Sequence, residues 1–149
     1  MTERFRPFAA VYAMLLKDGK IFLIRRYQTG WQDGKYTLPS GHLDGEESVS
    51  AAMTREVREE AGVEIEPQDL QFAHVMHRVR LGEREYVDFF FVTEKWIGEP
   101  YNAEKHKADE AQWFPVDKLP DNTIDSVRTA VENYRKGIPF SEFGWDGRI

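Results

Sequence analysis

The sequence predicts an α/β fold, in which helices cover both faces of a central mixed β-sheet to form an α/β/α sandwich. Three observations favour it: the chain of 149 residues has the usual length of one domain, β-rich apolar segments occur in pairs, and two helical segments alternate with them. Hydrophobic residues make up 41% of the chain and charged residues 31%, which is typical of a folded soluble protein. We therefore expect residues 1–149 to form a single domain.

The chain is expected to open with a strand pair between Pro7 and Arg26. Segments 8–16 (FAAVYAMLL) and 20–27 (KIFLIRRY) are apolar and β-rich, and Lys17-Asp18-Gly19 between them is typical of a hairpin turn. Residues 28–47 are rich in Gly, Asp and Pro, so they predict a long loop with at most a short strand at Tyr36 to Leu38. Such a loop in a compact domain is often functional.

A helix is predicted from Ser48 to Ala61, with Ser48 as the N-cap and Gly62 as the stop. At about 100° per residue, one apolar stripe of this helix is formed by Val49, Ala52, Met53, Val57 and Ala61. Glu56 and Glu60 fall within that stripe, and Glu59 lies at its margin. Because an unpartnered carboxylate is costly away from water, something positive must lie against these acids.

The remaining elements follow the same pattern of strands and one more helix. Segments 70–81 and 85–96 predict a second hairpin around Gly82-Glu83-Arg84, and residues 111–116 (AQWFPV) are a short strand candidate. A helix is predicted at 123–136, just before a glycine. Phe140, Phe143 and Trp145 either line an interface or fold back over the sheet, and we favour the second.

Composition excludes several classes of function. The absence of cysteine excludes disulfides, thiolate metal sites and thiol nucleophiles. A net charge of -6 with interspersed signs argues against a nucleic-acid polymer as partner. No apolar run reaches the roughly 20 residues of a membrane span, and the N-terminus lacks the features of a secretory signal, so a cytoplasmic location without membrane attachment is expected.

Two kinds of positive partner fit the acids of the first helix. An arginine or lysine is the more common partner of a buried acid, and Arg25, Arg26 and Arg55 are available. A hard divalent cation is the alternative, since carboxylates at positions i, i+3 and i+4 converge beside a helix and Mg²⁺ accepts a few such oxygens. Geometry alone leaves both open.

The pattern around the acids is more specific than the acids themselves. Residues 41–63 contain Gly41, five residues, Glu47, seven residues, and then Arg55-Glu56-Val57-Arg58-Glu59-Glu60-Ala61-Gly62-Val63. This stretch resembles the Nudix box at every specified position. "YTLPSG" before the box and "EAQWFPVDKLPDN" before the last helix also look like the MutT-like Nudix hydrolases.

The resemblance implies hydrolysis of a nucleoside diphosphate linked to another group, with Mg²⁺, or sometimes Mn²⁺, and an attacking water. It implies that Glu56 and Glu60 are the principal metal ligands and that Glu59 is a further ligand or the base that activates water. A further ligand in the family is a backbone carbonyl, which belongs to Ser40 in this chain; relatives often have glycine there.

Four other box residues are expected to have structural roles. The resemblance implies that Glu47 and Arg55 hold the loop to the helix by an ion pair. Gly41 is expected to permit a tight loop, and Gly62 to close the helix. Loss of these residues should still impair catalysis, because a displaced loop moves the metal ligands.

Outside the box, a loop acid is expected to supply a further ligand or base, and Glu110 is preferred over Glu104 and Asp109. Trp31 is the aromatic residue that core packing explains least, and Tyr36, Phe91 and Trp113 are assigned to the core rather than to base stacking. His42 is the histidine best placed to touch phosphate. Phosphate contacts are also open to the arginines Arg25, Arg26, Arg78 and Arg80, of which Arg26 is preferred.

The substrate is less constrained than the chemistry. The chain lacks the proline, the tyrosine and the upstream pattern that mark ADP-ribose, dinucleoside polyphosphate and coenzyme A hydrolases. A MutT-like enzyme that converts a nucleoside triphosphate to the monophosphate and pyrophosphate is therefore the leading hypothesis, with hydrolysis of ADP-ribose, a nucleotide sugar or a dinucleoside polyphosphate as the alternative. A catalytically silent nucleotide-binding regulator is the alternative from another class. Either a monomer or a homodimer is compatible with the sequence.

Overall fold

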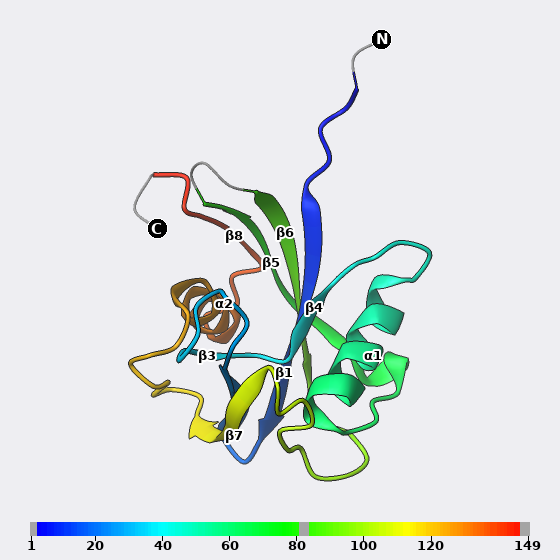
Figure 1. The fold of residues 1–149 in the computed structure, drawn as a ribbon, viewed down its shortest axis with the longest axis vertical. Coiled ribbons are helices and arrows are strands. Elements are labelled where there is room, and N and C mark those ends of the chain that lie inside the picture. The colour runs from blue at the N-terminus through cyan, green and yellow to red at the C-terminus, as the bar shows by residue number, and fades with distance from the viewer. Residues whose placement is uncertain (1–2, 81–83, 147–149) are drawn as a thin grey trace.

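The computed structural model of the protein describes residues 3–80 and 84–146. Two α-helices and a short 3₁₀ helix are present in this part of the chain: α1 (Val49–Ala61), α2 (Asp125–Arg135) and η1 (Pro67–Asp69). The strands there are β1 (Phe8–Lys17), β2 (Lys20–Arg26), β3 (Tyr36–Thr37), β4 (Ser40–His42), β5 (Gln71–Val79), β6 (Glu85–Thr93), β7 (Ala108–Pro115) and β8 (Phe140–Phe143). Figure 1 shows their arrangement.

The described strands form one mixed sheet in the order β3-β2-β1-β6-β5-β8, with β4 added beside β1 and β7 beside β2. Strand β1 is parallel to β6 along most of its length and antiparallel to β2 at only two residue pairs, Leu16 with Ile21 and Lys17 with Lys20. Farther back along β1, Ala10 to Tyr12 pair with β4 instead. The sheet therefore divides along β1, where β2 diverges from β1 and β4 pairs with β1 in its place.

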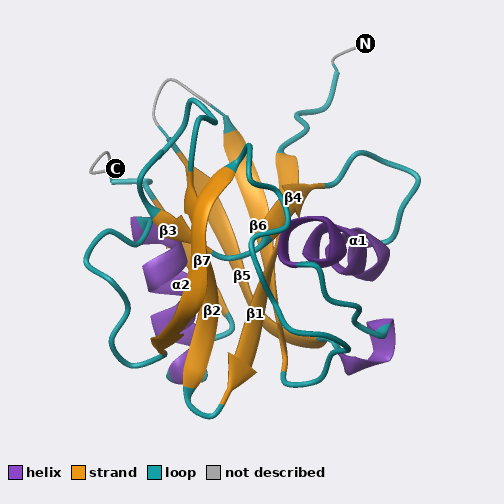
Figure 2. Ribbon diagram, turned by 60° about the horizontal axis from the view of Figure 1, so that its bottom comes forward, coloured by secondary structure: helices purple, strands orange, loops and turns teal. Residues whose placement is uncertain are grey.

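The two helices cover opposite faces of this sheet, as Figure 2 shows. Side chains alternate along β1, so that Val11, Ala13 and Leu15 pack on the α1 side and Met14 packs on the α2 side. The apolar stripe of α1 is buried at Ala52, Met53, Val57 and Ala61, and that of α2 at Val127, Ala130 and Val131. The predicted α/β/α sandwich with a mixed sheet is thus confirmed.

The caps of α1 are those that the sequence predicts. The Ser48 side chain accepts a hydrogen bond from the backbone N–H of Ala51, and Gly62 ends the helix at φ 71°. A Cβ at residue 62 would lie 2.1 Å from the Tyr101 ring, so both the backbone angle and the close approach require glycine.

Some elements differ from the prediction. Strand β7 begins at Ala108, earlier than expected, because it pairs with the whole of β2. Neither β4 nor β8 was expected, and β8 extends the edge of the sheet by pairing in parallel with β5. The favoured folding back over the sheet is confirmed for Phe143, which packs against the core, and for Trp145, whose ring lies 4.6 Å from that of His77 on β5, whereas Phe140 is exposed. The β5–β6 hairpin is confirmed by its antiparallel pairing, although residues 82 and 83 of its turn lie outside the described residues. No helix in the described ranges has the length and apolar character to span a bilayer.

Candidate active site

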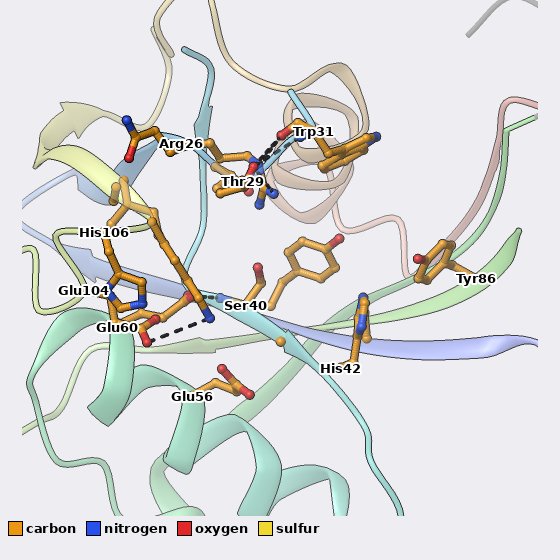
Figure 3. A pocket seen from close by; sticks show the side chains of 18 of the residues that line it. Arg26, Thr29, Trp31, Ser40, His42, Glu56, Glu60, Tyr86, Glu104 and His106 are labelled. Carbon is orange, nitrogen blue, oxygen red and sulfur yellow. Dashed lines mark hydrogen bonds and ion pairs between the residues drawn. The ribbon is translucent and has the colours of Figure 1, made fainter. Parts of the chain in front are cut away.

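A cavity of about 1010 Å³ opens where β2 diverges from β1 and its partner β4. Its lining comes from these strands, from α1, from β5 and β6, and from the segment 102–108 that follows β6. The volume is that of a site for a nucleotide-sized ligand. Figure 3 shows Glu56, Glu60 and Glu104 on one side of the cavity and Trp31, His42 and Tyr86 on the other.

Glu60 projects from the last turn of α1 into this cavity. Its Oε1 accepts a hydrogen bond from the backbone N–H of Ser40 at 2.7 Å, and within the described part of the chain it forms no ion pair. Burial raises the pKa of Glu60 to about 8, and the nearby carboxylates of Glu56 and Glu104 act in the same direction. Glu60 is therefore a carboxylate in need of positive charge.

Glu56 lies one turn earlier on the same face and is 14% exposed at its side chain. Arg55 Nη1 donates to its Oε1 at 2.8 Å. Burial raises the pKa of Glu56, and Arg55 opposes this rise. A Cβ on Gly41 of β4 would lie 2.1 Å from Glu56 Cδ, so a larger residue at position 41 would displace this carboxylate.

Arg55 links the loop of the box to its helix. Its Nε and Nη2 donate to Glu47 at 2.9 and 3.0 Å, and its Nη1 also lies 3.4 Å from Glu59. The hydrogen bonds to Glu47 are the largest cause of the raised pKa of Arg55. The arginine partner considered for the acids is thus present at Glu56 and Glu59, whereas Glu60 has no such partner among the described side chains.

The segment after β6 is fastened to the C-terminal end of α1. Tyr101 N–H donates to Ala61 O at 3.0 Å, and Ala103 N–H donates to Glu60 O at 3.1 Å. These bonds satisfy carbonyls that a helix end leaves free, and they position Glu104 in the cavity, where Lys107 Nζ lies 3.9 Å from it. Asn102 Oδ1 is buried in this segment without a hydrogen-bond partner from the described residues.

Most of the predicted site residues line the same cavity: Arg26, Trp31, Ser40, Gly41, His42, Glu56 and Glu60. Ser40 has extended backbone as part of β4, so the replacement of glycine by serine is compatible with the local conformation. Glu59 is not part of the lining; its side chain is 45% exposed beside Arg55. Tyr36, Phe91 and Trp113 pack in the core, as predicted.

The structure does not bring Glu110 to the other acids. Its carboxylate accepts hydrogen bonds from the Tyr36 hydroxyl and from Gln112, and Arg25 Nη1 lies 3.2 Å away. The loop acid in the cavity is Glu104, which the sequence ranked below Glu110. The cavity is also lined by three residues that the sequence did not predict: Tyr12, Tyr86 and Asn102. The two tyrosines lie in β-rich apolar segments, where a tyrosine is expected to pack in the core.

The carboxylates of Glu56, Glu60 and Glu104 are hard oxygen donors, and their number fits a divalent cation such as Mg²⁺. No three acidic or histidine side chains of the described residues converge in a preformed metal site, and Arg55 donates to Glu56 at 2.8 Å. The residue types and the unpaired charge of Glu60 nevertheless match the chemistry that the box implies.

Comparison with known proteins defines the class. The family model described as the NUDIX domain matches residues 5–134. A MutT NUDIX hydrolase of Burkholderia pseudomallei has a structure similar to this chain at a TM-score of 0.79 and 28% identity, covering 86% of this chain and 98% of its own. The chain therefore belongs to the Nudix hydrolase family.

Its relatives have different substrates in their names. An "ADP-ribose pyrophosphatase" of Methanocaldococcus jannaschii is 30% identical over 131 residues, which cover 87% of this chain and 74% of the relative. An "NAD-capped RNA hydrolase" of Vibrio atlanticus is 26% identical over 146 residues, which cover 84% of this chain but only 48% of the relative. An "8-oxo-dGTP diphosphatase" of Escherichia coli is 28% identical over 88 residues, which cover 59% of this chain and 66% of the relative.

Proposed function

We propose that this protein hydrolyses the pyrophosphate bond of a nucleoside diphosphate linked to another group, with Mg²⁺ or Mn²⁺ held at the acidic side of the cavity. The observation that carries the proposal is Glu60, a largely buried carboxylate that faces the cavity beside Glu56 and Glu104 without an ion pair of its own among the described residues. A bound positive charge would offset the burial of this carboxylate, and perturbed acids of this kind concentrate at functional sites.

The chain's own residues would act as follows. Glu56, Glu60 and Glu104 would hold the cation, with the carbonyl of Ser40 as a further ligand, and Glu59 keeps its expected role as another ligand or as the base. When bound, the cation neutralises phosphate oxygens and lowers the pKa of a coordinated water. Glu47 would orient Arg55 by their paired hydrogen bonds, and Arg55 in turn fixes the direction of Glu56.

A nucleoside triphosphate, cleaved to the monophosphate and pyrophosphate, is the substrate that we propose first. The cavity has room for a base and a ribose beside the acids, and the MutT-type relative covers 86% of this chain. ADP-ribose is the second candidate, because the relative of that name is 30% identical over 87% of the chain. The residues that line the cavity do not by themselves favour a nucleoside triphosphate over ADP-ribose.

A substrate panel tests this proposal directly. Purified protein would be incubated with canonical and oxidised nucleoside triphosphates, ADP-ribose, nucleotide sugars and dinucleoside polyphosphates, with Mg²⁺ or with EDTA, and the products weighed by mass spectrometry. We expect one substrate class to yield a nucleoside monophosphate, only with the metal present. Reaction in water enriched in ¹⁸O identifies the phosphorus that is attacked.

The matched variants are Glu60→Gln and Glu132→Gln, an exposed acid of α2. The first should lose turnover and the second should keep it. Equal turnover of both variants, or turnover that survives EDTA, would refute the proposal. If no substrate in the panel reacts while Mg²⁺ still binds, the regulatory alternative becomes the better account.

A further inference from the structure

The side of the cavity opposite Glu60 has a different chemistry from the acidic side. Aromatic and cationic side chains line it, among them Tyr12, Trp31, Arg78 and Tyr86. Figure 3 shows Trp31 and Tyr86 together on this side, away from Glu60. A diphosphate held at the acids would leave this half of the cavity for the rest of the substrate.

Tyr12 has an unused polar group in this half. The residue is only 9% exposed and its ring stacks on Phe90 with centroids 4.6 Å apart. The Tyr12 hydroxyl forms no hydrogen bond with any described residue. It is also not sealed from solvent, because among the described residues Asn102 Oδ1 is the only side-chain nitrogen or oxygen that is both fully buried and without a partner. The Tyr12 hydroxyl must therefore open on the cavity. Burial raises the pKa of Tyr12, so this hydroxyl stays protonated and able to donate.

Trp31 is fixed at the rim by its own loop. Arg26 lies under the indole, 5.0 Å from the ring, and donates to Trp31 O at 2.6 Å and to Thr29 Oγ1 at 2.8 Å. Two non-glycine residues of this loop, Gln28 and Gln32, have φ of 53°. Strained backbone persists where surrounding contacts enforce it, and it concentrates at functional sites. The loop thus holds Trp31 in place before any ligand arrives.

Tyr86 is also held in a fixed orientation. Arg78 lies 4.2 Å from its ring centroid, and the guanidinium of Arg78 is itself anchored by Asp88 at 2.6 and 3.2 Å. His42 lies against the same ring, with centroids 5.7 Å apart. Two rigid aromatic residues therefore accompany a free phenolic donor in this half of the cavity.

We propose that this half is the nucleobase subsite, in which the base packs against Trp31 and Tyr86 and the Tyr12 hydroxyl donates to an acceptor on the edge of the base. Every base has a flat π-face, so Trp31 and Tyr86 bind without much selectivity. A donor fixed at one point of the ring edge discriminates, because the bases carry their acceptors at different points of that edge and only some of them meet the donor. Tyr12 is therefore the specificity-determining residue. The inference rests on the proposed function for the placement of the diphosphate.

Binding of nucleoside monophosphates to metal-free protein tests the subsite separately from hydrolysis. AMP, GMP, CMP and UMP would be titrated in EDTA while tryptophan fluorescence is followed. We expect saturable quenching that Trp31→Phe abolishes and that Trp145→Phe, which changes an exposed tryptophan outside the cavity lining, preserves. If none of the four quenches, or if Trp31→Phe still reports binding with the same amplitude, the subsite is elsewhere.

Tyr12→Phe tests the specificity role, with Tyr134→Phe on α2 as the matched loss of a hydroxyl. For the best substrate we expect Tyr12→Phe to raise KM about 5- to 10-fold and to keep kcat within twofold. The rise in KM should differ between bases. Tm should stay unchanged, because the Tyr12 hydroxyl has no partner in the described structure. An unchanged KM, or an equal rise for all four bases, contradicts the assignment.

The two proposals fail in different ways. Binding of the monophosphates without hydrolysis of any substrate would remove the proposed function and leave the subsite. Hydrolysis with unchanged KM in both Trp31→Phe and Tyr12→Phe would leave the proposed function and remove the subsite.

Discussion

The helices α1 and α2 pack on opposite faces of the same sheet, and they differ in what they place beside their apolar stripes. Both bury small apolar side chains, with Val57 in α1 and Val131 in α2 fully buried. In α2 the acids are exposed, as at Glu132, whereas α1 directs Glu56 and Glu60 toward the cavity. Packing on the sheet therefore needs no carboxylates, and those of α1 serve the site.

The largest expected effect separates the acids of the two helices. Glu60→Gln should lower kcat/KM for the best substrate by about 100-fold or more, because a neutral amide is a much weaker ligand for a divalent cation. Glu132→Gln should stay within twofold of wild type. Steady-state kinetics at saturating Mg²⁺ measure both; comparable activity in the two variants would show that the α1 acids are not ligands.

The next largest effect concerns strand β4, which packs beside α1. Gly41→Ala should lower turnover about 10- to 100-fold, because its Cβ would occupy the place of the Glu56 carboxylate. Gly45→Ala, in the loop that follows β4, is the control: a Cβ there meets no atom within 4 Å, and the φ of 96° makes the substitution costly in stability. We expect Gly45→Ala to lower Tm with little loss of kcat. A larger loss of kcat in Gly45→Ala than in Gly41→Ala would show that Gly41 is not needed to leave room for the Glu56 carboxylate.

The apolar stripes themselves should be equivalent. Val57→Ala and Val131→Ala each remove two methyl groups from a fully buried position, so each should lower the free energy of unfolding by about 2 to 3 kcal/mol. Urea unfolding of the metal-free variants measures this. A loss confined to one of the two helices would mean that they do not contribute equally to the fold.

In metal-free protein, substitution of Glu60 is expected to raise the stability of the fold instead of lowering it. Its pKa is raised to about 8, so the folded state resists ionisation, and stability is lost as the pH rises from the ordinary pKa of 4.5 through 8. Glu60→Gln removes this loss and should be more stable than wild type by about 1 kcal/mol or more above pH 8, with little difference below pH 4.5. Thermal unfolding in EDTA across this range measures the gap. A constant gap would mean that Glu60 is not the titrating group.

Local patterns predicted the layers of the fold and the box residues. Alternation and turn residues identified β1, β2, β5 and β6, and the caps of α1 followed from Ser48 and Gly62. The strands β4 and β8 have three and four residues, and they form only because β1 and β5 offer an edge to pair with. Such pairing depends on distant residues and leaves no periodic signal of its own.

Site residues that lie on one segment of the chain could be predicted from the sequence, whereas those that the fold brings together from distant segments could not. Glu56 and Glu60 share one helix face, so their convergence follows from its 3.6-residue period. The choice between Glu104 and Glu110 depended on how the segment after β6 attaches to α1, through Tyr101 and Ala103. No sequence pattern reports those two hydrogen bonds, so the sequence favoured Glu110, which instead contacts Tyr36 and Arg25.

Calorimetric titration of metal-free protein with Mg²⁺, and in parallel with Mn²⁺, tests the central claim most directly. The wild-type protein should bind the cation, and a variant carrying both Glu56→Gln and Glu60→Gln should show no binding while remaining folded by circular dichroism. Binding of equal affinity in both proteins, or none in the wild type with substrate analogue present, would contradict a cation site built on these two carboxylates.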